Sequence, residues 1–161
     1  MKVRIVAWFP RDRYRCGRIA VVDAASSRIV EGPWPVLGKS DNRRAAKAGN
    51  PERLTIRSHG DTPLGLYRID GVRESAANEH YTFGPCRIIL SALDGDALIR
   101  DERATNGDAL LRIHGGALKP DGSLRPTYGC PRVHDSTLIR LRDYVLGIEP
   151  VRHFEARQEG T

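Results

Sequence analysis

The chain has 161 residues, 40% of them hydrophobic, and it contains no internal repeat or low-complexity tract. These values predict a single domain, residues 1–161, with a buried core. The formal net charge is +6, but the basic residues, mostly arginine, are scattered along the sequence. Because neither a groove-reading helix nor a base-stacking motif accompanies them, we expect no nucleic-acid partner.

An apolar run opens the chain in the segment MKVRIVAWFP. It is too short and too interrupted for a signal peptide or a membrane span, so it predicts a first strand, Val3 to Phe9. Further strand-like runs are bounded by Gly, Pro, Asp or Asn. They are Arg18 to Val22, Arg28 to Gly32, Gly65 to Asp70, Arg87 to Leu90, Leu110 to His114 and Val151 to Ala156. This pattern favours a mostly β fold with one or two helices, arranged as a sandwich or barrel.

The remaining segments predict one long loop and the helices. The polar stretch from Gly38 to Gly60 is expected to be a loop or short helix beside the functional site. A clear helix begins at an N-cap, Asp135 or Ser136, and ends at Gly147. Ser91 to Arg100 is a weaker helix candidate. The apolar face expected for the clear helix is Leu138, Ile139, Leu141, Val145 and Leu146.

The stretch from Leu111 to Val133 carries the candidate chemistry. An apolar run ends at His114, and Cys130 follows sixteen residues later in a Tyr-Gly-Cys turn. Pro and Gly residues between the two predict a loop that can bring them together. An imidazole beside a thiol can take its proton and later return it to a leaving amine. The pattern predicts a Cys130 nucleophile with His114, at about its normal pKa, as base and then acid.

Attack by Cys130 on a carbonyl would create an oxyanion that needs hydrogen-bond donors. The backbone N–H groups of the turn, Tyr128, Gly129 and Cys130, are the candidates, because glycine lets the main chain point inward. Pro131 has no N–H and cannot contribute. If Cys130 and His114 form a preformed ion pair, alkylation of the thiol is expected below the pH range of an ordinary thiol.

The order of the two residues distinguishes between cysteine-enzyme families, because papain-like enzymes have the cysteine first. Histidine-first order with this spacing resembles the L,D-transpeptidase (YkuD-type) catalytic domain, in which a Ser/Thr-x-Gly-Cys-apolar-Arg/Asn element follows about fifteen residues after a histidine. The matching residues are His114-Gly115 and Thr127-Tyr128-Gly129-Cys130-Pro131-Arg132. Two upstream segments also resemble the family, over Asp61 to Ile69 and over Gly84 to Leu90. The resemblance covers roughly Gly17 to Leu146.

The resemblance implies an L,D-transpeptidase-like β fold and a covalent mechanism on peptidoglycan stem peptides. The Cys130 thiolate would attack the L-side carbonyl of an L,D-peptide bond in a stem tetrapeptide, expel D-alanine and leave a thioester. A neighbouring stem as acceptor gives a 3-3 crosslink, a free D-amino acid gives exchange, and water gives carboxypeptidase activity. The sequence does not choose among these acceptors.

The resemblance also implies a location, the periplasm or cell envelope. We expect the protein to reach this location either after loss of a leader peptide or by an export route that needs no leader peptide. Small size without a leader also resembles interbacterial effectors of this family, for which an immunity protein would be a partner. Two rival functions stay open: a hydrolase of the same nucleophile class acting on another amide, and a non-catalytic wall-binding module.

Several further side chains are weaker candidates. Substrate contacts are proposed at Arg132, Thr127, Gly115, His59 and Tyr67. A polar loop position for His59, core packing for Tyr67 and a salt bridge within the turn for Arg132 are the alternatives.

The remaining histidines and cysteines suggest no second site. Cys16 and Cys86 are expected to be buried thiols, with a disulfide between them as the alternative. Zinc ligation by His59, His114, His134 and Cys130 has no supporting ligand spacing, so we expect no metal, no cofactor and a monomer.

Overall fold

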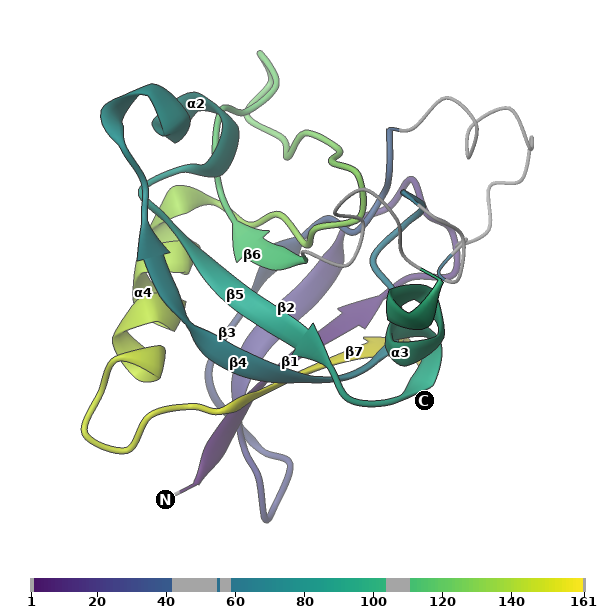
Figure 1. The fold of residues 1–161 in the computed structure, drawn as a ribbon, viewed down its shortest axis with the longest axis vertical. Helices are drawn as coiled ribbons and strands as arrows, with labels where there is room; N and C mark the ends of the chain where they lie inside the picture. Colours follow the sequence, from purple (N-terminus) through teal and green to yellow (C-terminus); the bar gives the residue numbers. More distant parts are fainter. Residues whose placement is uncertain (1, 42–54, 56–58, 104–110, 161) are drawn as a thin grey trace.

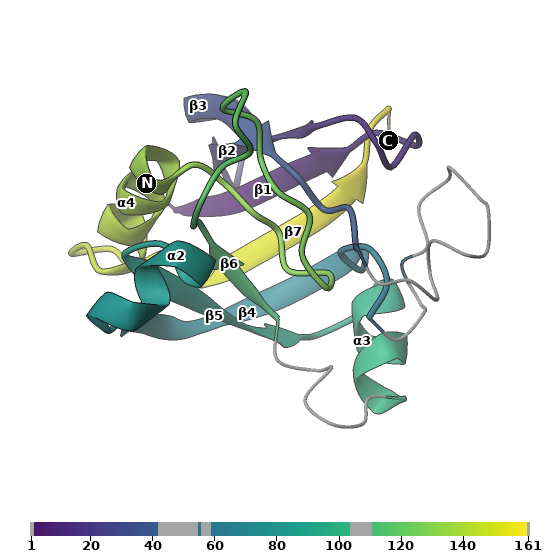
Figure 2. The same ribbon diagram turned by 90° about the horizontal axis from the view of Figure 1, so that it is seen from above.

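The computed structural model describes residues 2–41, 55, 59–103 and 111–160 (Figure 1). Within these ranges, seven strands form one sheet that curls strongly, as the two perpendicular views show (Figure 1, Figure 2). The strands are β1 (Val3–Phe9), β2 (Gly17–Asp23), β3 (Ile29–Val36), β4 (Gly65–Glu74), β5 (Cys86–Ala92), β6 (Arg112–His114) and β7 (His153–Gln158). Each predicted strand is confirmed to within a few residues, except that Leu110, the predicted start of one, lies outside the described residues. The fold is mostly β as expected.

The order of strands across the sheet is β3-β2-β1-β7-β4-β5-β6. The first and last strands of the chain, β1 and β7, pair in parallel at its centre, whereas the other pairs are antiparallel. Short loops suffice for hairpins such as β1–β2, but the β1–β7 contact joins the two ends of the sequence. The centre of the sheet therefore forms only when the whole chain is present.

One large hydrophobic core fills the concave side of the sheet. Ile19 of β2, Ile88 of β5 and Phe154 of β7 are fully buried there. Helix α4 (Asp135–Val145) adds Leu138 and Leu141, also fully buried. Leucine truncation at such positions typically costs about 2–5 kcal/mol, so this helix is fixed firmly to the sheet.

Helix α4 confirms the predicted helix but corrects its details. His134 is the N-cap, and Asp135 is already helical. Ile139 and Leu146, expected on the buried face, are 38% and 62% exposed. The reason is geometric, because the stripe at positions 138, 141 and 145 already covers the face that meets the sheet.

The other helices are short. Helix α3 (Gly95–Glu102) begins later than the predicted Ser91, because Ser91 and Ala92 belong to β5 and pair with β4. The pair η1 (Ala77–Glu79) and α2 (His80–Phe83) was not predicted, since two such short turns show no apolar periodicity. Most of the predicted loop from Gly38 to Gly60 lies outside the described residues. Among the described helices, none is long and apolar enough to cross a membrane.

Candidate active site

The segment that carries the cysteine closes the sheet between its two outer strands. Arg132 pairs in parallel with His114 of β6, and antiparallel with Leu37, the residue that follows β3. The backbone bonds are Val133 N–H to His114 O, 2.9 Å, and a reciprocal pair between Arg132 and Leu37, both 2.9 Å. Because β3 and β6 are the outer strands, this segment completes a barrel-like ring, and its closure decides where the cysteine lies.

This pairing places the candidate nucleophile and base on one face. Cys130 stands two residues before Arg132, and Arg132 pairs with His114. Residues two apart on an extended segment point to the same side, so Cys130 is a diagonal neighbour of His114, with about 8 Å between Cα atoms by ordinary strand geometry. The same register puts Cys130 beside Arg112, whose backbone N–H acts on the thiol. Strand pairing therefore brings the segment that carries Cys130 alongside His114.

His114 is 3% exposed and held in one tautomer. Its Nδ1 lies 2.8 Å from the carbonyl oxygen of Gly115, which can only accept, so Nδ1 carries the proton and Nε2 keeps a lone pair. Phe83 packs edge-on against the imidazole, with 5.2 Å between ring centroids. The ring is thus oriented from two sides before any substrate binds.

The pKa of His114 differs from the predicted normal value. Burial, the largest cause, and the nearby guanidinium groups of Arg132, Arg112 and Arg87 together lower this pKa to about 4, against the opposing Gly115 hydrogen bond. A charged imidazole is disfavoured in a buried, positively charged setting. At neutral pH His114 is therefore an uncharged base, already in the form that can accept a proton.

Cys130 is a neutral thiol in the resting protein. Burial raises its pKa, although the Arg112 backbone N–H and the charges of Arg112, Arg100 and Arg132 act in the opposite direction. No hydrogen bond joins its sulfur to His114 among the interactions of the described residues. Both features argue against a preformed thiolate–imidazolium pair. As a whole residue, Cys130 is partly exposed.

The turn before Cys130 depends on glycine and threonine. Gly129 has φ +114°, and a Cβ there would lie 2.7 Å from the Gly60 carbonyl oxygen. The Thr127 hydroxyl donates to the Cys130 carbonyl oxygen, 2.7 Å, and accepts from the Gly129 N–H, 3.0 Å. The hydroxyl of Thr127, which was predicted as a substrate contact, therefore shapes the turn.

The same bonds narrow the choice of oxyanion donors. The Gly129 N–H is engaged by Thr127 and is removed from the predicted set. In the described part of the chain, the backbone N–H groups of Tyr128 and Cys130 have no hydrogen-bond partner. They are the two remaining main-chain candidates at the turn.

A buried polar network that the sequence did not reveal supports the turn from behind. Arg100, 1% exposed, donates to the carbonyl oxygens of Asp61, 2.6 Å, and Tyr128, 3.1 Å. The Thr62 hydroxyl donates to the Gly129 carbonyl oxygen, 2.7 Å. Arg13 forms a buried salt bridge with Asp61, 2.9 Å. An arginine in a short polar helix resembles a surface residue in sequence, so nothing there identified Arg100.

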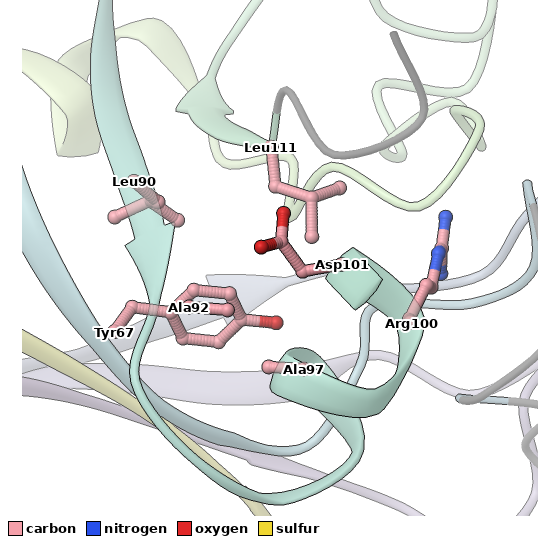
Figure 3. A pocket seen from close by; sticks show the side chains of 7 residues that line it. All are labelled: Tyr67, Leu90, Ala92, Ala97, Arg100, Asp101 and Leu111. Atoms are coloured by element: carbon pink, nitrogen blue, oxygen red, sulfur yellow. The ribbon is translucent and has the colours of Figure 1, made fainter. Parts of the chain in front are cut away.

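Tyr67 is a core residue and not a substrate contact. It is 1% exposed, its hydroxyl donates to the Pro63 carbonyl oxygen, and burial raises its pKa. Figure 3 shows its ring beside Ala97 at a cavity of about 10 Å³, too small for a ligand, with Arg100 projecting away from the ring. The core-packing alternative for Tyr67 is correct.

The other predicted contacts divide into positioning residues and exposed ones. Gly115 donates its N–H to Phe83 O, 2.8 Å, and a Cβ there would lie 2.1 Å from Asp135 Oδ1, so Gly115 positions His114 instead of contacting substrate. His59 packs against Tyr128, with 6.0 Å between centroids, and Tyr128 is 63% exposed. These two rings lie beside the turn that precedes Cys130.

Arg132 is 6% exposed and donates from Nη2 to the Thr82 carbonyl oxygen, 3.0 Å. Its Nε is buried and has no partner. The described residues offer it no salt bridge, so the alternative of an ion pair within the turn is not seen. Burial lowers the pKa of this guanidinium.

The remaining cysteines are free thiols. Cys86 is buried as predicted, whereas Cys16 is exposed, which corrects the expectation of a second buried thiol. A disulfide between them is not formed. In the described ranges, no group of three or more His, Cys, Asp or Glu side chains is placed to hold a metal ion.

Comparison with known proteins gives a structural similarity only. No family model and no curated protein matches the chain. Among solved structures, Bdellovibrio bacteriovorus Bd1075 is similar over 98% of this chain, with a TM-score of 0.60 and 13% sequence identity. This chain spans about half, 47%, of the length of that protein. At this identity, the similarity shows that the two share a fold.

Proposed function

We propose that this protein is a cysteine acyltransferase of the L,D-transpeptidase type that acts on peptidoglycan stem peptides in the cell envelope. One observation carries the proposal: the segment of Cys130 pairs with His114 through Arg132, and the Gly115 carbonyl leaves the Nε2 lone pair of His114 available as base. The motif order in the sequence supplies the substrate class.

The first half-reaction follows from the two neutral groups. As the stem carbonyl approaches Cys130, His114 Nε2 takes the thiol proton while the sulfur–carbon bond forms. Arg112, Arg100 and Arg132 favour the negative charge that develops on sulfur. The amides of Tyr128 and Cys130 are the donors for the oxyanion. The imidazolium then gives its proton to the departing amine of D-alanine as the carbon–nitrogen bond breaks, which leaves a thioester.

The second half-reaction reverses the roles. An acceptor amine or water attacks the thioester, His114 takes the acceptor's proton, and the thiol is restored with that proton. The low pKa of His114 keeps the imidazole uncharged at neutral pH, so that its lone pair is free to accept a proton, and makes it a strong acid once it is protonated. Crosslinking, D-amino-acid exchange and carboxypeptidase activity share this thioester.

The test is incubation of purified tetrapeptide muropeptides with the protein, with and without added D-amino acids, followed by mass analysis of the products. We expect loss of D-alanine or its exchange, and loss of all conversion in Cys130→Ala. Cys16→Ala is the matched control, because it removes an exposed thiol and is expected to keep full activity.

The outcomes also separate the rival functions. Conversion by Cys130→Ala at the rate of the intact protein would show that the catalytic assignment is wrong. Binding of wall fragments without any conversion would favour a wall-binding module. Cys130-dependent cleavage of a different amide bond would favour the rival hydrolase.

A further inference from the structure

A cleft of about 430 Å³ lies beside the candidate active site. Segments that are distant in sequence line it: Lys39 and Asp41 after β3, Tyr81 on α2, Lys119 and Arg125 in the loop after β6, and Arg132 beyond Cys130. We call this the basic cleft. Arg132 belongs both to this cleft and to the segment that carries the nucleophile, so the cleft borders the segment of Cys130.

The basic cleft carries an excess of positive charge. Four of its side chains are cationic (Lys39, Lys119, Arg125 and Arg132) and one is acidic (Asp41). None of the four cations forms a salt bridge within the described part of the chain. Lys39 lies over the Tyr14 ring, 5.1 Å from its centroid, and Arg125 Nε donates to the Leu118 carbonyl oxygen. A concave surface with several uncompensated cations attracts an anionic group.

Arg132 gives a second and independent indication of a ligand. It is more than nine-tenths buried and lines the cleft, yet its Nε has no hydrogen-bond partner. Buried donors in folded proteins are almost always paired, so an unpaired one calls for an explanation. A guanidinium presents several N–H donors in a planar fork that matches a carboxylate.

We propose that the basic cleft binds a free carboxylate of the stem peptide while the scissile carbonyl lies at Cys130. This rests on the proposed function and makes it more specific. Cys130 and Arg132 are two residues apart, about 6–7 Å between Cα atoms along an extended segment, so a stem peptide, whose residues also advance by about 3.3 Å each, can reach both. The protein is therefore selective for stems with free carboxylates and discriminates against stems whose carboxylates are amidated.

Binding is tested without turnover, in Cys130→Ala, by calorimetry with a free-acid stem tetrapeptide and its carboxamide analogue. We expect at least tenfold tighter binding of the free acid at low salt, and a smaller ratio at high salt. Lys119→Gln combined with Arg125→Gln should reduce the ratio to less than threefold. Lys2→Gln combined with Arg152→Gln removes the same charge outside the basic cleft and should leave the ratio unchanged.

Three results would overturn the proposal: equal binding of the two peptides, no binding of either, or an equal loss of selectivity in the control pair. Competition by inorganic phosphate as strong as that by acetate would show a general anion site instead of a carboxylate site. Failure of the proposed function is recognised separately. In that case the intact protein converts no muropeptide, whereas Cys130→Ala still distinguishes the free acid from the carboxamide.

Discussion

The two sides of the nucleophile segment differ in how their charged groups are satisfied. Behind the turn, Arg13, Asp61 and Arg100 are almost fully buried and hydrogen-bonded. In the basic cleft, cations such as Lys119 and Arg125 form no salt bridge with any residue that the structure describes. Paired buried charges fix a geometry, whereas unpaired charges at a concave surface are available to a ligand. One side therefore supports Cys130, whereas the other side is open to a ligand.

The supporting side should be the more sensitive to substitution. Asp61→Asn leaves Arg13 buried without its counter-charge, so we expect a loss of about 3–5 kcal/mol in the free energy of unfolding. Urea denaturation measures this. Arg140→Gln is the control, because it breaks an ion pair with Glu31 at the surface and should cost far less. Equal losses in the two variants would contradict the distinction between the two sides.

The stability of the protein should depend on pH through His114. The pKa of His114 is lowered from 6.5 to about 4 in the folded state. As pH falls through this range, the unfolded chain therefore binds a proton at this residue that the folded chain does not bind. The free energy of unfolding is therefore highest above pH 6.5 and falls by up to about 3 kcal/mol toward pH 4.

Chemical denaturation of the intact protein and of His114→Gln at several pH values tests this dependence. The variant should show a shallower loss of stability over the same pH range. His80→Gln, at an exposed histidine, should retain the full slope. Identical slopes in the intact protein and His114→Gln would refute the lowered pKa.

The nucleophile turn can be disturbed without removing any charge. Gly129→Ala combines a positive φ with a clash against the Gly60 carbonyl, so we expect a loss of about 2 kcal/mol in stability and at least a hundredfold loss of turnover. Gly122→Ala is the matched control, since Gly122 also has a positive φ but faces open space. It should lose about 1 kcal/mol and keep its turnover. Wild-type turnover in Gly129→Ala would show that the turn geometry is not required.

The smallest expected effect concerns the thiol itself. Burial raises the pKa of Cys130, so its alkylation by iodoacetamide should rise with pH through a midpoint above the ordinary thiol value of about 8.5. The measurement uses Cys16→Ser, so that the exposed thiol does not contribute, with site assignment by mass spectrometry. A midpoint below about 8 would instead indicate a preformed ion pair.

Local features of the sequence predicted the fold class well. The strands were found because each apolar run is bounded by residues that end strands, and α4 because its apolar spacing is helical. The prediction of which α4 residues face the core was less accurate. Ile139 and Leu146 are apolar in sequence but exposed, because the width of the contact with the sheet is a tertiary property.

Sequence by itself also determined the two residues of the candidate chemistry, Cys130 and His114, since glycine-bounded residues after an apolar run are a local signal. Only the tertiary structure decided how these two residues are arranged and in which direction their pKa values are shifted. Closure of the sheet by Arg132 between the Leu37 and His114 backbones sets their register, and burial sets both pKa values. The contacts of Arg100 and the basic cleft each bring together segments that are far apart in the chain. The desolvation and the charges that shift the pKa values arise only after those segments have met.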